Sequence, residues 1–213
     1  MLFRSITNPG GEPHHPLTMT TLGLELPTDP RWVNIAEMNI GEILIDHAWC
    51  EQKAASSCIS MIVYYADYEK LVAVLTPVVA EEWGHFQRVL KELGKRNIPL
   101  GKPRKDLYVN ELQVQIKTTP SYTENLLNRL LLNALIEARS CERFKLLSEH
   151  IADDSLRKFY RELMISEAGH YRNFIELAEE YVPVERVRQR WKEILDIEAR
   201  ILQNMDVRGD RMH

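Results

Sequence analysis

Long apolar runs are missing from this sequence of 213 residues, and cysteine is scarce. No apolar stretch reaches the roughly 18 residues that cross a bilayer, so we expect no membrane-spanning segment. No continuous apolar stretch follows basic residues at the N-terminus, so we expect no secretory signal. The three cysteines lack CxxC spacing, which excludes a rubredoxin-type or zinc-ribbon site and is typical of a cytoplasmic protein.

A large excess of charge of either sign is missing as well. The net charge of −4 argues against a uniformly basic surface for nucleic acid, although it leaves room for a local basic patch. The chain is 45% apolar and 27% charged, which excludes a disordered protein and suffices for one sizeable core.

The sequence divides into three parts. Residues 1–30 hold five of the ten prolines and show little periodicity, so we predict an irregular N-terminal arm. We expect its histidine pair, His14 and His15, to lie in a solvated loop. Residues 31–205 have a helical pattern, and we expect the charged tail, residues 206–213, to be frayed.

Four long segments carry apolar residues at spacings of three and four, at about 40–65, 71–93, 126–144 and 156–181. Pro77 is predicted to kink the second segment or to start a new helix. A connection at about 97–119 separates the second and third segments and holds a short helix near 105–115. A fifth amphipathic segment follows Pro183. The pattern predicts an all-α four-helix bundle with a long crossover between helices 2 and 3, plus a C-terminal amphipathic helix.

An internal repeat relates the two halves of the bundle. Glu82-Trp-Gly-His85-Phe matches Glu167-Ala-Gly-His170-Tyr, and each motif lies about 30 residues after a further glutamate, Glu51 or Glu137. Two helical hairpins with the same polar insert predict a pseudo-symmetric bundle.

Each apolar stripe therefore carries a carboxylate near its middle. A lone carboxylate in a core costs several kcal/mol, and the simplest alternative is that these glutamates face water. That alternative does not explain why a histidine follows three residues after a glutamate in both halves, where the two side chains share a helix face.

Four carboxylates and two neutral imidazoles carry a charge that two divalent cations neutralise. One glutamate from each of two helices and Glu-x-x-His from each of the other two is the ligand set of di-iron and di-manganese carboxylate bundles. Oxygen and imidazole ligands suit iron, manganese or zinc. The predicted metal ligands are Glu51, Glu82, His85, Glu137, Glu167 and His170. We assign Glu51 and His85 to one metal, Glu137 and His170 to the other, and Glu82 and Glu167 as bridges.

Polar neighbours of these ligands leave alternatives open. Glu142 lies about 140° round the helix from Glu137, so we expect it to face elsewhere, although it is the alternative ligand. His47 is either a partner of a ligand or a core histidine. Glu81 and Ser166 either orient the opposite histidine or are solvated.

A basic stretch begins one turn after His85, and Glu92 is the one acidic residue within it. It is either a solvated face or a surface that binds phosphates beside the mouth of a metal pocket. Its members are Arg88, Lys91, Lys95, Arg96, Lys102, Arg104 and Lys105.

Four segments resemble the bacterial tRNA 2-methylthio-N6-isopentenyladenosine hydroxylases, a family of ferritin-like non-haem di-iron monooxygenases. These segments are His47-Ala-Trp-Cys-Glu-Gln-Lys-Ala-Ala, Glu81-Glu-Trp-Gly-His-Phe, Glu137-Ala-Arg-Ser-Cys-Glu-Arg-Phe and Ser166-Glu-Ala-Gly-His-Tyr. The resemblance implies O2-dependent hydroxylation of the isopentenyl side chain of the modified adenosine beside the anticodon, with two iron ions held by the six ligands. It also implies a reductase or ferredoxin as electron donor and gives the basic stretch a ligand, the anticodon stem-loop of tRNA.

Three other functions remain possible for the same fold. One is another ferritin-like di-metal oxidase, peroxidase or manganese catalase, which metal content and activity on peroxide would separate. Iron storage would require a large assembly. A helical adaptor would bind no metal.

Overall fold

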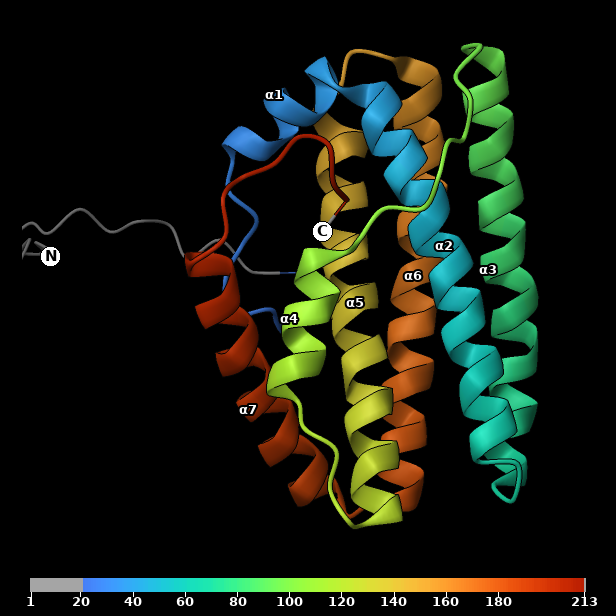
Figure 1. The fold of residues 1–213 in the computed structure, drawn as a ribbon, viewed down its shortest axis with the longest axis vertical. Helices are drawn as coiled ribbons and strands as arrows, with labels where there is room; N and C mark the ends of the chain where they lie inside the picture. Colours follow the sequence, from blue (N-terminus) through green and yellow to red (C-terminus); the bar gives the residue numbers. More distant parts are fainter. Residues whose placement is uncertain (1–20, 213) are drawn as a thin grey trace, which may run out of the picture.

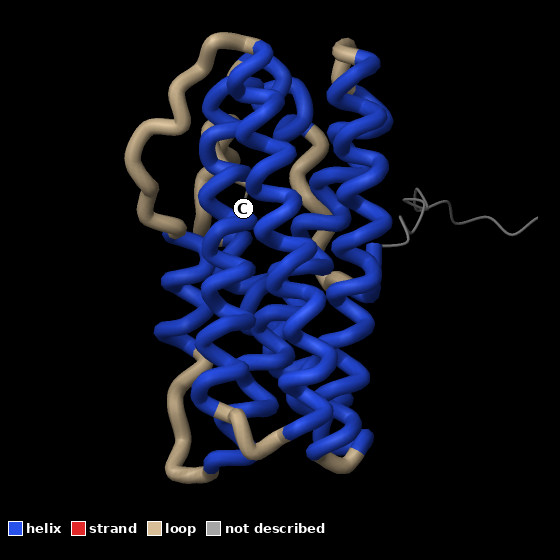
Figure 2. Tube along the Cα trace, turned by 90° about the vertical axis from the view of Figure 1, so that its right-hand side faces the viewer, coloured by secondary structure: helices blue, strands red, loops and turns tan. Residues whose placement is uncertain are grey.

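The computed structural model describes residues 21–212, and within that range the chain is helical and contains no strand (Figure 1). Four long helices lie side by side along the long axis (Figures 1 and 2). They are α2 (Ile40–Tyr64), α3 (Glu69–Lys95), α5 (Tyr122–His150) and α6 (Asp154–Tyr181). Helix α2 packs chiefly on α3, and α5 packs chiefly on α6, which confirms the two predicted hairpins.

The connection between the hairpins spans the length of the bundle. It leaves the end of α3, passes through α4 (Leu107–Gln115) and reaches the opposite end of the bundle, where α5 begins (Figure 1). This is the predicted long crossover, and a bundle with one such connection has the ferritin-like topology.

Three further elements complete the described chain. They are the 3-10 turn η1 (Thr21–Gly23), α1 (Arg31–Met38) and α7 (Val184–Gln203), which lies beside α4 (Figure 1). Among residues 21–212, none of the helices combines the length and the hydropathy that crossing a bilayer requires. Residues 1–20 of the predicted arm, with His14 and His15, lie outside the described residues.

Local sequence sets the helix boundaries. Asp106, Ser121 and Asp153 each accept a hydrogen bond from a backbone N–H in the first turn of α4, α5 and α6. Pro77 lies inside α3, which continues to Lys95, so the alternative that Pro77 starts a new helix is wrong. A proline removes a single backbone donor, and burial of the apolar side chains on both sides of it keeps the helix in place.

Buried apolar side chains form two clusters, one toward each end of the bundle. On α3, Leu71 and Leu75 belong to the first cluster, and Val89 and Leu93 belong to the second. The other three long helices divide in the same way. The middle of each long helix therefore lies between two apolar layers, and this is where the repeated polar motifs are.

The C-terminal tail packs against the bundle, so the prediction that it is frayed is wrong for residues 206–212. Met212 is fully buried, its N–H donates to Asp46 at 2.8 Å, and its carbonyl accepts from Arg143 at 2.5 Å. A Cβ on Gly209 would lie 2.7 Å from the backbone oxygen of Ile35, so the close contact with α1 requires glycine. The sequence pattern missed this packing because it depends on backbone groups rather than on an apolar stripe.

Candidate metal centre

All six predicted ligands meet in the middle of the bundle. Helix α2 supplies Glu51 and α5 supplies Glu137. Each of the other two helices supplies one Glu-x-x-His pair: Glu82 and His85 from α3, and Glu167 and His170 from α6. Each of the six residues is at most 6% exposed, so the alternative that the glutamates face water is wrong.

The cluster consists of two overlapping groups of four. Donor atoms of Glu51, Glu82, His85 and Glu167 lie within 4.8 Å of one another. Donor atoms of Glu82, Glu137, Glu167 and His170 meet the same limit. Because Glu82 and Glu167 belong to both groups, this is the geometry of two neighbouring cation positions that share two carboxylates.

Contacts between the hairpins hold the two histidines toward these shared carboxylates. His85 Nδ1 lies 3.1 Å from an oxygen of Glu167, and His170 Nδ1 lies 2.7 Å from an oxygen of Glu82. Each histidine also lies close to the glutamate three residues before it on its own helix. The i, i+3 spacing therefore places both members of each motif on the inner face.

Burial and mutual repulsion alter the acidity of the cluster. Burial and the charge of Glu167 raise the pKa of Glu82 to about 7, and burial also raises the pKa of Glu137 well above its usual range. Burial lowers the pKa of His170, but its contacts with Glu167 and Glu82 outweigh burial and raise that pKa to about 12. The cluster without a cation therefore retains protons that metal ions displace when they bind.

Buried oxygen and nitrogen atoms that form no hydrogen bond show that these residues fit metal ions. Both carboxylate oxygens of Glu82, one oxygen of Glu167 and Nδ1 of His85 are buried and form no hydrogen bond with any described residue, although the histidines lie within ion-pair distance of these carboxylates. Such groups are expensive to bury, and a divalent cation satisfies several of them at once. The oxygen and nitrogen donors suit iron, manganese or zinc.

Two neighbouring side chains make the hydrogen bonds that support ligands. His47 is fully buried, and its Nε2 lies 2.5 Å from an oxygen of Glu51. His170 Nε2 lies 2.8 Å from a carboxylate oxygen of Glu81, on the helix opposite. Partners of this kind fix the orientation of metal ligands. The structure thus favours the orienting role for His47 and Glu81, and among the described residues it gives no contact that would do the same for Ser166.

Glu142 lies elsewhere, as its helical position predicts. Its carboxylate accepts from buried Arg139 at 2.5 Å and from the hydroxyl of Thr28 at 2.6 Å. Arg139 also donates to Glu198 of α7, which accepts from Tyr108 of α4. Glu142 therefore belongs to a buried ionic network that joins α5 to its covering helices.

A pocket of about 360 Å³ leads to the cluster between α2, α4 and α5; we call it the inner pocket. Glu137 lines it together with the apolar side chains of Ala54, Leu132 and Ile136. A cavity of about 20 Å³ within the cluster shares Ala54, Ile136 and Glu137 with the inner pocket and is bounded by Met212. A substrate in the inner pocket would thus reach the candidate metal positions on the side of Glu137.

Comparisons with known proteins identify the family. The family model for tRNA-(MS[2]IO[6]A)-hydroxylase (MiaE) matches residues 16–213. The chain belongs to the MiaE family.

Two relatives are each named tRNA 2-(methylsulfanyl)-N(6)-isopentenyladenosine(37) hydroxylase. The protein from Pseudomonas putida is 35% identical over 158 residues, which cover 74% of this chain and 76% of that protein. The protein from Salmonella typhimurium is 28% identical over 239 aligned positions, covering 89% of this chain and 87% of that protein. A solved structure, named "Protein 43 with aldehyde deformylating oxygenase activity from Synechococcus", matches with a TM-score of 0.84 and 35% identity. The match covers 89% of this chain and 94% of that one.

The predicted basic stretch divides into three groups in this MiaE-family chain. Arg88, Lys95 and Arg96 form ion pairs with acidic side chains of α3, α6 or the turn before α6. Arg104 and Lys105 instead line the inner pocket, and Arg104 also pairs with Glu42. Lys91 and Lys102 are exposed and form no ion pair with any described residue.

Sequence reasoning predicted Glu137, Arg104 and Lys105 as site residues but missed Lys53 and Asn133, which line the inner pocket with them. Asn133 lies four residues before Glu137 on the same face of α5, and Lys53 lies two residues after Glu51. The polar row Asn125, Arg129, Asn133 and Glu137, at intervals of four residues along α5, was a usable signal. The contribution of α4 was not visible, because it depends on how the crossover packs.

Proposed function

We propose that this protein hydroxylates the isopentenyl side chain of 2-(methylsulfanyl)-N6-isopentenyladenosine in tRNA, using O2 and a pair of iron ions. Membership of the MiaE family supports the tRNA substrate. The single observation that carries the proposal for this chain is the buried cluster of six donors, with its two groups of four sharing Glu82 and Glu167. Because the substrate is tRNA, we further propose that the protein acts in the cytoplasm.

Six residues would hold the metal pair. Glu51 and His85 would bind one ion, Glu137 and His170 would bind the other, and Glu82 and Glu167 would bridge them. When bound, iron supplies the activation of O2 that side chains cannot perform. The chain supplies ligand geometry, the partners His47 and Glu81, and exclusion of water by the two apolar clusters.

The inner pocket suits both ends of the proposed substrate. Ala54, Leu132 and Ile136 offer an apolar wall beside Glu137 for an isopentenyl group. Arg104 and Lys105 line the same pocket and would pair with the phosphates of the RNA strand. Contacts on both ends of the substrate would hold the side chain in one orientation, which is the main contribution of a protein to such a reaction.

The atom balance implies a further partner. Hydroxylation places one oxygen atom of O2 in a C–H bond of the substrate, and the other oxygen atom leaves as water. That second step consumes two electrons and two protons. Since amino-acid side chains do not supply these electrons catalytically, we propose an electron-donating reductase or ferredoxin.

The test is mass analysis of nucleosides from tRNA that carries the modified adenosine, after incubation with iron-loaded protein, O2 and a reductant. We expect a gain of one oxygen atom on the isopentenyl group. Glu82→Ala and His170→Ala should lose both iron and hydroxylation, whereas Glu176→Ala, an exposed glutamate of α6, should keep both. Unchanged tRNA with the fully iron-loaded parent protein would contradict the proposal.

A second candidate is an oxygenase that acts on a small apolar molecule. It is favoured by the match to the Synechococcus protein, whose name gives it aldehyde deformylating oxygenase activity. The polar and cationic residues of the inner pocket favour the RNA substrate instead. Incubation with a long-chain aldehyde under the same conditions separates the two, since formate is released only in the second case.

A further inference from the structure

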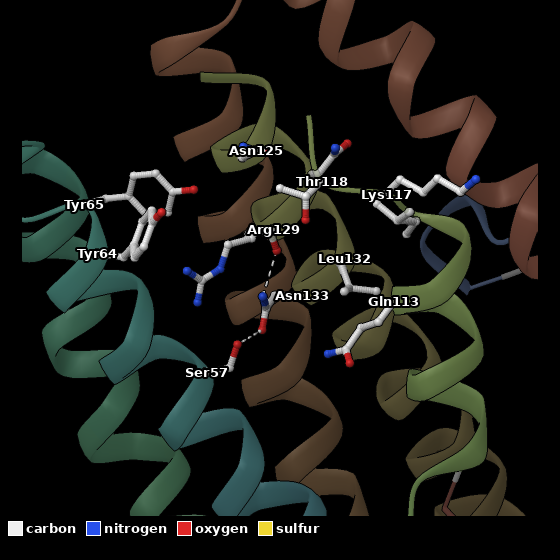
Figure 3. A pocket seen from close by; sticks show the side chains of 12 residues that line it. Ser57, Tyr64, Tyr65, Gln113, Lys117, Thr118, Asn125, Arg129, Leu132 and Asn133 are labelled. Carbon is white, nitrogen blue, oxygen red and sulfur yellow. Dashed lines mark hydrogen bonds between the residues drawn. The ribbon is translucent and has the colours of Figure 1, made fainter. Parts of the chain in front are cut away.

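We infer that a second pocket, of about 370 Å³, binds a nucleotide adjacent to the modified adenosine in the same RNA strand. This outer pocket lies between α2, the end of α4 and α5 (Figure 3). The inference rests on the proposed function for the identity of the RNA, but its geometry and its binding measurement are independent of the metal chemistry.

The outer pocket adjoins the inner pocket. Both are lined by Ser57 of α2, Gln113 of α4, and Leu132 and Asn133 of α5. A strand whose modified base occupies the inner pocket therefore has the outer pocket beside it. Both volumes lie in the range of roughly 300–1,000 Å³ that is typical of sites for small molecules.

The spacing along α5 suits consecutive nucleotides. Asn125, Arg129 and Asn133 line the outer pocket at intervals of four residues, and Glu137 continues the same row into the inner pocket. Four residues rise about 6 Å along a helix. Neighbouring nucleotides of a stacked strand are about 3.4 Å apart, and the separation grows when the strand is extended. The outer pocket thus begins within one to two nucleotides of the candidate reaction site.

An exposed aromatic ring stands at the edge of this pocket. The Tyr64 side chain is 65% exposed, and its ring is stacked against Tyr122 at 6.2 Å and an interplanar angle of 28°. The hydroxyl of Tyr122 donates to the carbonyl of Tyr64 at 2.9 Å, which ties the two residues together. A fixed, exposed ring is the platform on which proteins stack the bases of single-stranded RNA.

The polar groups of the pocket also suit a nucleotide. The Asn133 amide is oriented, because its oxygen accepts from Ser57 at 3.0 Å and its nitrogen donates to the Arg129 carbonyl at 2.7 Å (Figure 3). Arg129 and Lys117 contribute positive charge, and none of the described lining residues is acidic. In a chain of net charge −4, this local excess of positive charge favours a polyanion.

The decisive variants alter the ring of Tyr64. Tyr64→Leu removes the aromatic face and retains an apolar side chain, Tyr64→Phe retains the face, and Val63→Ala changes an adjacent exposed residue that does not line the pocket. The readouts are the Kd for a fluorescent anticodon stem-loop, by anisotropy, and kcat/KM on that stem-loop and on the free modified nucleoside.

We expect Tyr64→Leu to raise the Kd and KM for the stem-loop by about 5- to 150-fold, the range of one lost base stack. Its loss on the free nucleoside should be much smaller, because a nucleoside has no neighbour to fill the outer pocket. Tyr64→Phe and Val63→Ala should bind the stem-loop within about twofold of the parent protein, because both keep the stacking face.

Two results would overturn the inference: Tyr64→Leu binding the stem-loop as tightly as Tyr64→Phe, or equal losses on stem-loop and nucleoside. A parent protein that does not bind the stem-loop would overturn it as well. Failure of the proposed function has a different signature, since the iron-loaded parent protein would then hydroxylate neither substrate. In that case the Kd values of the three variants still decide whether the outer pocket binds RNA.

Discussion

Glu81 illustrates how one side chain acts on the metal centre without belonging to it. Its carboxylate lies 2.8 Å from Nε2 of His170, whose Nδ1 faces the shared carboxylates. Because Glu81 holds Nε2 of His170, Nδ1 of the same ring stays directed at the candidate metal position.

Loss of this partner should weaken metal binding without abolishing it. We predict that Glu81→Ala lowers the affinity for Fe(II), measured by anaerobic titration, by about 10- to 100-fold. Glu81→Gln should lose less, since its amide oxygen still accepts a hydrogen bond. Glu176→Ala is the control, and an unchanged affinity in Glu81→Ala would remove the orienting role.

Protonation of the cluster sets the pH dependence of metal binding. The pKa of Glu82 is raised to about 7 and that of His170 to about 12, so Glu82 is partly protonated and His170 is protonated near neutral pH, and a metal ion must displace these protons. Affinity for Fe(II) should therefore rise with pH. Calorimetric titration in two buffers of different ionisation enthalpy should report net proton release at neutral pH, and binding without proton release would contradict this prediction.

At the scale of the element, α5 performs two tasks on two faces. Glu137 faces the bundle interior, while Arg139 and Glu142 face the helices that cover the bundle. Arg139 is fully buried and donates to Glu198 at 2.9 and 3.0 Å, which joins α5 to α7.

Removal of the arginine would leave two carboxylates buried without their cation. We predict that Arg139→Met lowers the free energy of unfolding by about 3–5 kcal/mol, measured by urea denaturation. Arg200→Met, at an exposed position of α7, should change it by less than about 0.5 kcal/mol. A loss below about 1 kcal/mol in Arg139→Met would mean that the network contributes little.

The C-terminal tail is also anchored to the bundle, because the Met212 side chain is fully buried and lines the small cavity within the metal-ligand cluster. Met212→Ala should lower the free energy of unfolding by about 2–5 kcal/mol and speed the removal of iron by a chelator. Met38→Ala, at a side chain that is 76% exposed, is the matched control. Equal rates of iron removal in the two variants would show that the tail does not close the site.

At the scale of the whole molecule, two basic residues of the crossover, Arg104 and Lys105, line the inner pocket, and the exposed Lys102 precedes them in the chain. We predict that reversing charge at Lys102, Arg104 and Lys105 weakens tRNA binding, more strongly at low salt. The slope of log affinity against log salt concentration should fall by about 0.7–0.9 for each lost phosphate contact. Unchanged affinity at low salt, with normal iron content, would exclude this surface.

Features that follow a regular spacing along a helix could be predicted from the sequence. Apolar spacing predicted the four long helices, and the doubled Glu-x-x-His motif predicted which side chains meet. Features that depend on packing between segments far apart in the sequence could not be predicted from it. The buried tail depends on backbone hydrogen bonds of Met212, and the pockets depend on the place that α4 takes beside α5.

The most direct test of this account is the number of metal ions that the folded protein binds. Anaerobic titration with Fe(II), followed by iron analysis of the desalted protein, should give two ions per chain. Glu137→Ala should retain fewer, at an unchanged helical content. A parent protein that is fully folded and binds no iron would contradict the account, because the buried carboxylates would then have to be stable without the cations that explain them.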